Sequence, residues 1–266
     1  MISTARLRFA SRVAGIHFSL SLLIAALVAS LVFFVWYPAP YRGVMGSFKL
    51  FWLIVGVDVV CGPLLTLILS NPEKKRREMI LDLSLVAIIQ LSAFIYGLHN
   101  VYEARPIVVV YEIDRFRALA TTDIYQKELP QAPQEYQKLP LWDIWLLATR
   151  EKKTDDDTLK DIELATQGYD IGQRPSWWIP YDEGKSKIKE KAHPLQALLE
   201  NTTQDEKALI QQAITRSGLP AEKLYYLPFT SSRATDWMAI LDDSMNLLDV
   251  IPVDAFDRLK PSAGNK

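Results

Sequence analysis

The sequence is poor in the residues that bind metals or form disulfides. It has one cysteine, Cys61, and three histidines. A single thiol excludes a disulfide within the chain, and so few ligands exclude a closed zinc site of the Cys/His type. No glycine-rich phosphate-binding loop is present, and 30 Lys and Arg are balanced by 31 Asp and Glu. We therefore expect no cofactor, no metal and no nucleic-acid surface.

The balanced charge hides two unlike halves. Residues 1–98 contain nine basic and four acidic residues, whereas residues 99–266 contain 21 and 27. Residues 13–41 contain no Lys, Arg, Asp or Glu, and such a stretch can cross the roughly 30 Å hydrocarbon layer as a helix. Because the apolar run has no convincing small-x-small cleavage site, an uncleaved anchor at 16–37 is favoured over a signal peptide.

Two further apolar runs follow, at 49–70 and 79–98. Asp58 and Pro63 interrupt the first run, and Asp82 interrupts the second. Each run is long enough for a membrane-spanning helix. The sequence therefore predicts three transmembrane helices.

Basic residues predict which ends of these helices face the cytoplasm. Arg6, Arg8 and Arg12 precede the first helix, and the turn at 71–78 contains four consecutive basic residues. Lys and Arg near span ends stay on the cytoplasmic side, so the C-terminal part is predicted outside. The opposite span ends carry aromatic residues typical of a membrane interface, which buried helices of a soluble protein would not explain. They are Trp36, Tyr37, Tyr41, Trp52, Tyr96 and Tyr102.

The remaining residues predict a periplasmic α+β domain with an antiparallel sheet. Segments 106–113 and 116–121 read as one β-hairpin, and 236–241 and 245–251 as another. Between them, Thr203 and Glu206 match a helix capping box. The predicted division is a cytoplasmic N-terminus at 1–15, a three-span region at 16–98, a periplasmic domain at 99–260 and a disordered tail at 261–266.

Catalytic residues are not evident in this outer domain. A hydrolytic triad needs a base beside its nucleophile, and His193 reads instead as a helix-entry residue before Pro194. The tryptophans are expected to lie mostly in the core, and any exposed one would suggest a binding surface. We predict that the protein is not an enzyme.

The membrane region offers the more informative polar residues. Asp58 and Gln90 lie about nine and eleven residues into their helices, near the middle of the bilayer. An ionisable group there is costly and is a functional candidate. Two interpretations remain open: a polar clasp between Asp58 and Gln90 within the protein, or contact with a partner's membrane helix. Asp82 lies near the cytoplasmic end, within reach of water or the basic turn.

Cys61 reads as a small packing residue beside Gly62 and Pro63. The ordered strings in this region are Val57-Asp58-Val-Val-Cys-Gly62-Pro63-Leu64-Leu65-Thr66, the basic run 74–77, Leu81-Asp82-Leu83, Gln90-Leu91, Tyr96-Gly97, Arg105-Pro106 and Asp114-Arg115-Phe116. Together they resemble the type IV pilin accessory family, bacterial inner-membrane proteins also called TfpX/TfpZ-like or FimB-like. Beyond residue 117 the likeness is loose.

The resemblance implies a helper in the production, stability or assembly of a cognate type IV pilin. It carries over no catalytic residue. In type IV pili the pilin waits in the inner membrane as one apolar helix with an acidic residue near its N-terminus and its head outside. We hypothesise that the three helices hold the pilin helix while the outer domain contacts the head. Asp58 would repel an ionised pilin carboxylate, so that contact requires a protonated Asp58 or donation from Gln90.

Two rival classes remain. A membrane-anchored periplasmic sensor would need a partner for its output, because the predicted cytoplasmic segments are short. An intramembrane aspartyl enzyme would need Asp58 and Asp82 to share a proton, and their different depths argue against that.

Overall fold

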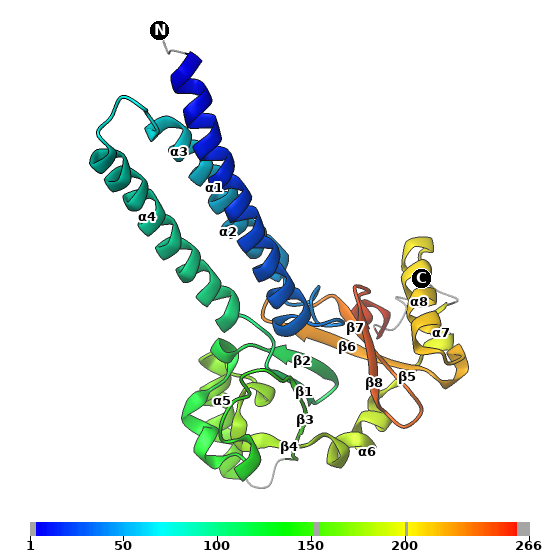
Figure 1. Cartoon of the computed structure of the whole chain (residues 1–266). Coiled ribbons are helices and arrows are strands. Elements are labelled where there is room, and N and C mark those ends of the chain that lie inside the picture. The colour runs from blue at the N-terminus through cyan, green and yellow to red at the C-terminus, as the bar shows by residue number, and fades with distance from the viewer. Residues whose placement is uncertain (1–3, 152–154, 200–201, 260–266) are drawn as a thin grey trace, which may run out of the picture. The chain divides into compact units, whose positions relative to one another are not determined.

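The computed structural model describes residues 4–151, 155–199 and 202–259. The predicted tail at 261–266 lies outside these ranges. The chain forms two compact units, the first built from Met1–Tyr37 and Ser47–Glu103 and the second from Pro38–Gly46 and Ala104–Lys266. Figure 1 shows the long helices of the first unit and the sheet of the second.

The first unit consists of three long helical stretches. They are α1 (Thr4–Leu31) with the π-helical turn η1 (Val32–Trp36), then α2 (Ser47–Gly56), η2 (Val57–Cys61) and α3 (Gly62–Leu69) in succession, and finally α4 (Arg76–Glu103). Thr4–Trp36, Phe51–Leu69 and Arg76–Glu103 are long and apolar enough to cross a membrane. Only 17%, 17% and 11% of their most apolar windows is buried within the protein, so most of this apolar surface needs lipid or another helix. The prediction of a three-helix membrane protein is confirmed.

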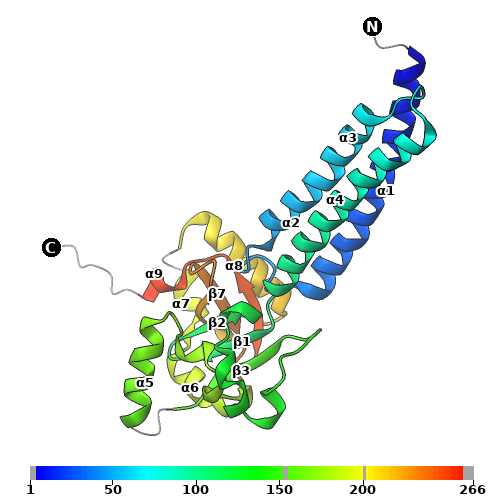
Figure 2. The same ribbon diagram turned by 90° about the vertical axis from the view of Figure 1, so that its left-hand side faces the viewer.

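The middle stretch holds the other two helices together. Helix α1 packs along α3 and η2, and α4 packs along α2 and α3. Figure 2 shows the helices side by side. The buried positions of α1 are small residues, which allow close approach of helices in a membrane; they are Ala10, Ala14, Ser21 and Ala25.

The second unit is built on one eight-stranded sheet. Its strands are β1 (Val108–Glu112), β2 (Arg115–Leu119), β3 (Trp145–Thr149), β4 (Trp178–Pro180), β5 (His193–Pro194), β6 (Tyr225–Ser231), β7 (Trp237–Leu241) and β8 (Leu247–Ile251). The order is β4-β3-β1-β2-β6-β7-β8, with β5 paired to β6. Both predicted hairpins are present as β1–β2 and β7–β8.

The sheet is mostly but not wholly antiparallel. Strands β1 and β3 pair in parallel, and so do β2 and β6. A parallel pair requires a long crossover connection, and the segments between these strands contain the helices and loops of the unit. The predicted α+β class is confirmed, and the sheet is mixed because β1 pairs with β3, and β2 with β6, in parallel.

Helices and short turns complete the second unit. The helices are α5 (Asp155–Thr166), α6 (Tyr181–Lys191), α7 (Leu195–Leu199), α8 (Gln204–Ser217) and α9 (Ala255–Leu259). The capping box is confirmed, because Thr203 Oγ1 accepts the amide of Glu206 while Glu206 Oε2 accepts the amide of Thr203. Helix α8 ends at Gly218, whose φ of 67° suits a residue without a side chain.

Residues 38–46 link α1 to α2 but belong to the second unit. Val44 and Met45 are buried, and Ser231 Oγ on β6 donates a 2.7 Å hydrogen bond to the carbonyl of Val44. The ring of Tyr41 stacks on Phe229 with 6.1 Å between centroids. We call residues 38–46 the inter-helix loop. Its place in the sheet unit differs from the division drawn from hydropathy, which set the boundary at residue 98.

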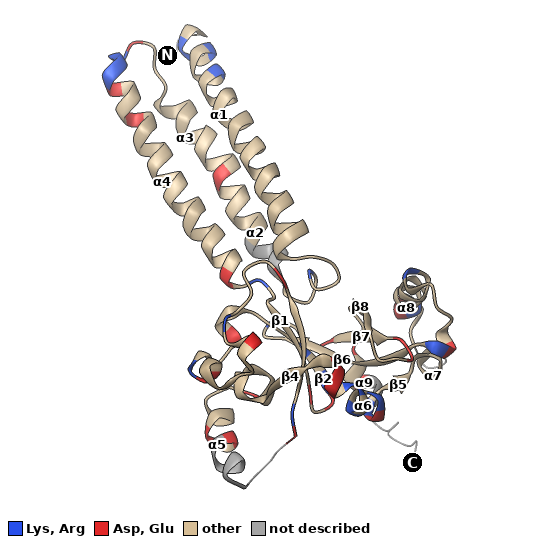
Figure 3. Ribbon diagram, turned by 60° about the horizontal axis from the view of Figure 1, so that its bottom comes forward, with Lys and Arg blue, Asp and Glu red and all other residues tan. Residues whose placement is uncertain are grey.

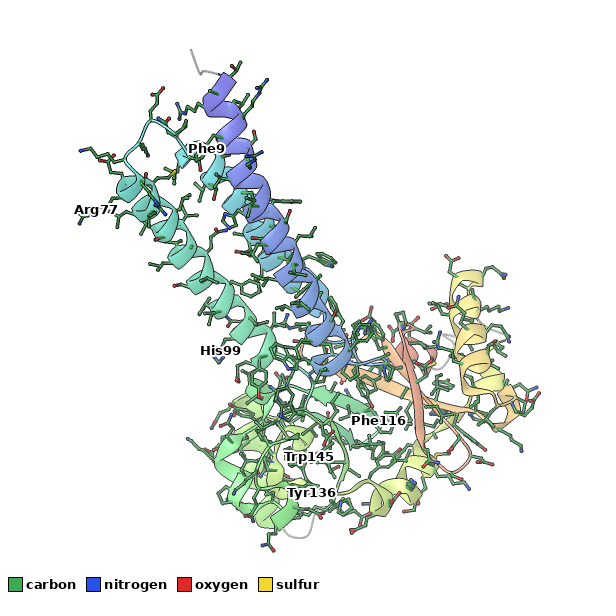
Figure 4. The ribbon with its side chains drawn as sticks, viewed as in Figure 1. Phe9, Arg77, His99, Phe116, Tyr136 and Trp145 are labelled. Atoms are coloured by element: carbon green, nitrogen blue, oxygen red, sulfur yellow. The ribbon has the colours of Figure 1, made fainter. Side chains whose placement is uncertain are left out.

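The tryptophans divide as expected for a mostly buried set. Trp177 and Trp178 are each 1% exposed, whereas Trp142 is 64% exposed. Figure 4 shows Trp145 with Phe116 and Tyr136 in the sheet unit. Of these residues, Trp142 is the one that fits a surface contact.

Candidate functional site in the helical unit

Asp58 and Gln90 meet in the interior of the helical unit. Gln90 Nε2, on α4, donates to the backbone carbonyl of Asp58 at 3.2 Å and to Asp58 Oδ1 at 3.4 Å. Both side chains are half-buried. The structure therefore brings together the two polar residues that the sequence places at mid-membrane depth.

The backbone around Asp58 explains why Gln90 reaches its carbonyl. Residues Val57–Cys61 form a π-helical turn, in which a carbonyl pairs with the amide five residues later. Five residues after Asp58 is Pro63, which has no amide hydrogen. An unpaired carbonyl is costly in hydrocarbon, and the side-chain amide of Gln90 supplies the missing donor.

Gly62 allows α4 to come close enough for this contact. A Cβ atom at Gly62 would lie 2.1 Å from Gln90 Nε2. One level away, a Cβ atom at Gly97 would lie 2.8 Å from the side chain of Ile54. Asp58, Gly62, Pro63 and Gln90 thus form one interhelical arrangement, which we call the Asp58–Gln90 clasp.

The clasp leaves hydrogen-bonding capacity unused. Gln90 Oε1 is buried and has no hydrogen-bond partner among the described residues. The 3.4 Å contact is also the only hydrogen bond that a described residue gives to the Asp58 carboxylate. The arrangement is therefore a clasp that also keeps an acidic group half-exposed between helices.

Asp82 does not join this arrangement. It forms an ion pair with Lys74 at 2.6 Å, and both side chains are about one-third exposed. Eight residues separate Asp82 from Gln90 on α4, about 12 Å along a helix. Asp82 therefore ties the turn between α3 and α4 to the helix that follows it.

His17 is a polar residue of this unit that the sequence reading missed. Its Nδ1 lies 2.7 Å from Thr66 Oγ1 of α3, and Thr66 is 2% exposed. The available signal was the place of His17 as the only ionisable side chain between Arg12 and Tyr37.

Charged residues mark one end of the helical unit. Figure 3 shows Lys and Arg at the beginning of α1 and at the beginning of α4, and none along the rest of these two helices. In Figure 4, Arg77 and His99 lie at opposite ends of α4. The asymmetry is the pattern that orients helices across a membrane.

The buried charges of the sheet unit serve its own packing. Arg174 pairs with Glu128 at 3.1 Å and also with Asp161. Burial raises the pKa of Glu112, and this effect is opposed by Arg117, 2.9 Å away, and by the amide of Gly172 at 2.7 Å. Because every one of these charges has a partner, we assign them to holding loops against the sheet.

Metal ligands do not converge in the described residues. In residues 4–151, 155–199 and 202–259, no three His, Cys, Asp or Glu side chains are placed to hold an ion. Cys61 is exposed on its helix and is a free thiol.

Comparisons with known proteins give the family. The family model described as fimbrial assembly protein FimB matches residues 5–46. The fimbrial assembly protein of serogroup I from Dichelobacter nodosus is 47% identical over 252 residues, which is 95% of this chain and 98% of the relative. The serogroup E1 protein of the same organism is 46% identical over the same shares. No solved structure matches the chain.

The match at residues 5–46 covers α1 and the inter-helix loop, whereas the strings that carry the resemblance lie at 57–117. The two full-length relatives span both regions. The expected resemblance is confirmed, and with it a role in fimbrial assembly. The chain belongs to the FimB family of fimbrial assembly proteins.

Proposed function

We propose that this protein assists fimbrial assembly by binding a type IV pilin subunit in the bacterial inner membrane before the subunit enters the fibre. The observation that supports this most directly is the half-exposed Asp58 within an apolar helical unit. An acidic group in hydrocarbon is costly. A contact with a further membrane helix would explain why the Asp58 carboxyl lies in this apolar region.

The helical unit has room for such a partner. Most of the apolar surface of its helices is not covered by the protein itself. Helix α1 and α4 each pack on the middle stretch, and contacts between α1 and α4 are few in the described residues. A pilin helix would lie along this surface, with its aqueous head beside the sheet unit.

The proposed orientation follows from charge. Arg6, Arg8, Arg12 and the basic run 74–77 would face the cytoplasm, which puts the sheet unit in the periplasm. There it would meet the head of a pilin whose helix lies in the same membrane. We propose that the protein acts by binding and sheltering the subunit, without catalysis.

Deleting the gene tests this proposal. We expect the amount of pilin, the number of fimbriae and twitching motility to fall, because unsheltered subunits are lost before assembly. Tagged full-length protein, extracted in mild detergent, should co-purify the pilin. Unchanged pilin level, piliation and motility together with no co-purification would refute the proposal.

Asp58 provides the sharper test. Asp58→Asn keeps a polar group that can still pair with Gln90, whereas Asp58→Leu removes it. We expect reduced pilin recovery in Asp58→Leu, and full piliation in both variants would exclude a role for this carboxyl in the contact. Cleavage of a pilin precursor by the purified protein would instead indicate an enzyme.

A further inference from the structure

His17 is an ionisable side chain placed inside an apolar helix. It lies five residues after Arg12, the last basic residue before the apolar run, or about 7.5 Å along the helix. A polar group at that depth must be satisfied by protein. The structure satisfies only part of it.

Thr66 holds one ring nitrogen of the imidazole, Nδ1. With Nδ1 2.7 Å from Thr66 Oγ1, the hydroxyl can donate to Nδ1, and the neutral ring then carries its proton on Nε2. No described residue gives or takes a hydrogen bond at Nε2, and the His17 side chain is half-exposed. In that tautomer the His17 ring presents an oriented N–H donor that has no acceptor among the described residues.

Gln90 cannot supply the same donor. Its Nε2 is engaged with the carbonyl and carboxylate of Asp58, and its Oε1 is buried. Thr66 is eight residues beyond Asp58 on the middle stretch, about 12 Å along a helix. A carboxyl group placed at His17 would therefore lie at a different depth from Asp58 and avoid close repulsion.

We propose that His17 Nε2 donates a hydrogen bond to a carboxyl side chain in the first turns of a partner's membrane helix. The inference rests on the proposed function, because the partner helix is that of the pilin subunit. A partner helix that begins on the same side of the membrane as α1 would carry an acidic residue of its first turns at the depth of His17. The partner is thus identified by a carboxyl acceptor one to two helical turns from that end of its membrane helix.

The test uses a matched pair of substitutions in the full-length protein. In His17→Asn the amide occupies the place of Nδ1, so the bond to Thr66 can remain while the outward donor is lost. In His17→Gln the amide reaches the place of Nε2, so the outward donor can remain while the bond to Thr66 is lost. Thr66→Val removes the hydroxyl but leaves the imidazole.

The readout is the amount of pilin recovered per amount of folded, detergent-extracted protein, with its melting temperature measured in parallel. We expect His17→Asn to reduce recovery about three- to tenfold, the range of one interhelical hydrogen bond, while His17→Gln retains most of it. Replacing the early acidic residue of the pilin by Leu should reduce recovery to a similar extent. It should add little to the loss in His17→Asn, because both changes remove one bond.

Equal recovery by His17→Asn and the unchanged protein would overturn the inference while leaving the proposed function standing. A result in which His17→Gln and Thr66→Val fail while His17→Asn does not would also overturn it, because His17 would then serve only to hold α1 to α3. Failure of the unchanged protein to recover any pilin would overturn the proposed function and this inference together.

Discussion

At the scale of single residues, the clasp shows how one short string can specify an interhelical contact. Asp58 and Pro63 are five positions apart, the spacing at which a π-turn leaves the Asp58 carbonyl without an amide. The similar depth of Asp58 and Gln90, and hence their pairing, can be predicted from their positions in the two apolar runs. It does not reveal the π-turn, because helix periodicity is the same on both sides of it.

Gly62→Ala should destabilise the helical unit. The new methyl group would overlap Gln90 Nε2, so α4 must move or the clasp must open. We expect a loss of about 1–3 kcal/mol, typical of overpacking, measured as a lower melting temperature in detergent. Gly56→Ala is the matched control on the same stretch, because nothing lies within 4 Å of a Cβ atom there. Equal effects of the two changes would contradict the close-approach role of Gly62.

Ile113→Gly should stabilise the sheet unit. Ile113 lies in the turn between β1 and β2 with φ of 54°, a conformation that a β-branched residue adopts at a cost, and it is 64% exposed. The relief of strain outweighs the added flexibility of glycine, for a net gain of a few tenths to about 1 kcal/mol. Thermal unfolding of the purified protein measures this. Ile113→Ala, which keeps a Cβ atom, should gain less, and an equal gain would point away from backbone strain.

At the scale of elements, local patterns predicted what local forces determine. The two hairpins and α8 carry their own turn and capping signals, and all three are present. The parallel pairing of β2 with β6 is different, because Phe116 and Phe229 are register partners across more than a hundred residues. The sequence of neither strand indicates which strand it pairs with. The placement of the inter-helix loop on β6 could not be predicted for the same reason.

The inter-helix loop depends on one close approach. A Cβ atom at Gly43 would lie 2.2 Å from the Trp237 ring. Gly43→Ala should therefore displace the loop from the sheet and lower the free energy of unfolding by roughly 1–3 kcal/mol. The measurement is a lower melting temperature of the purified protein. Trp237→Phe, which removes the atoms that would clash, should restore part of that loss when combined with Gly43→Ala. An additive rather than compensating double variant would show that the two positions act independently.

At the scale of the whole molecule, alkaline pH should weaken the sheet unit. Burial raises the pKa of Tyr41 from 10.0 to about 12, and burial also raises the pKa values of Tyr111 and Tyr181. The folded state thus keeps protons that the unfolded chain releases, so stability is full below pH 10 and falls as pH rises toward 12. For Tyr41 alone the loss is about 2–3 kcal/mol.

Urea unfolding across this pH range, followed by tyrosinate absorbance, measures the effect. Tyr41→Phe should make the decline with pH shallower. An unchanged pH dependence in that variant would show that Tyr41 is not held protonated by the fold.

Orientation in the membrane is the other whole-molecule prediction. A phosphatase that is active only in the periplasm should be active when fused after residue 259 and inactive when fused in the basic turn near Lys74. The reverse result would place the sheet unit in the cytoplasm, where it could not meet the head of a pilin, and would remove the basis of the proposed function.

The inter-helix loop also has a consequence for biosynthesis. The ribosome makes residues 38–46 early, yet the strands that cover them, β6 and β7, begin only at Tyr225 and Trp237. At translation rates of about 5–20 residues per second, the loop waits roughly ten to forty seconds for its docking surface. During that interval the side chains of Val44 and Met45 are not covered by β6 and β7. A chain that stalls before β6 therefore exposes these two apolar residues on a loop whose ends are already joined to membrane helices, where proteases and chaperones can recognise them.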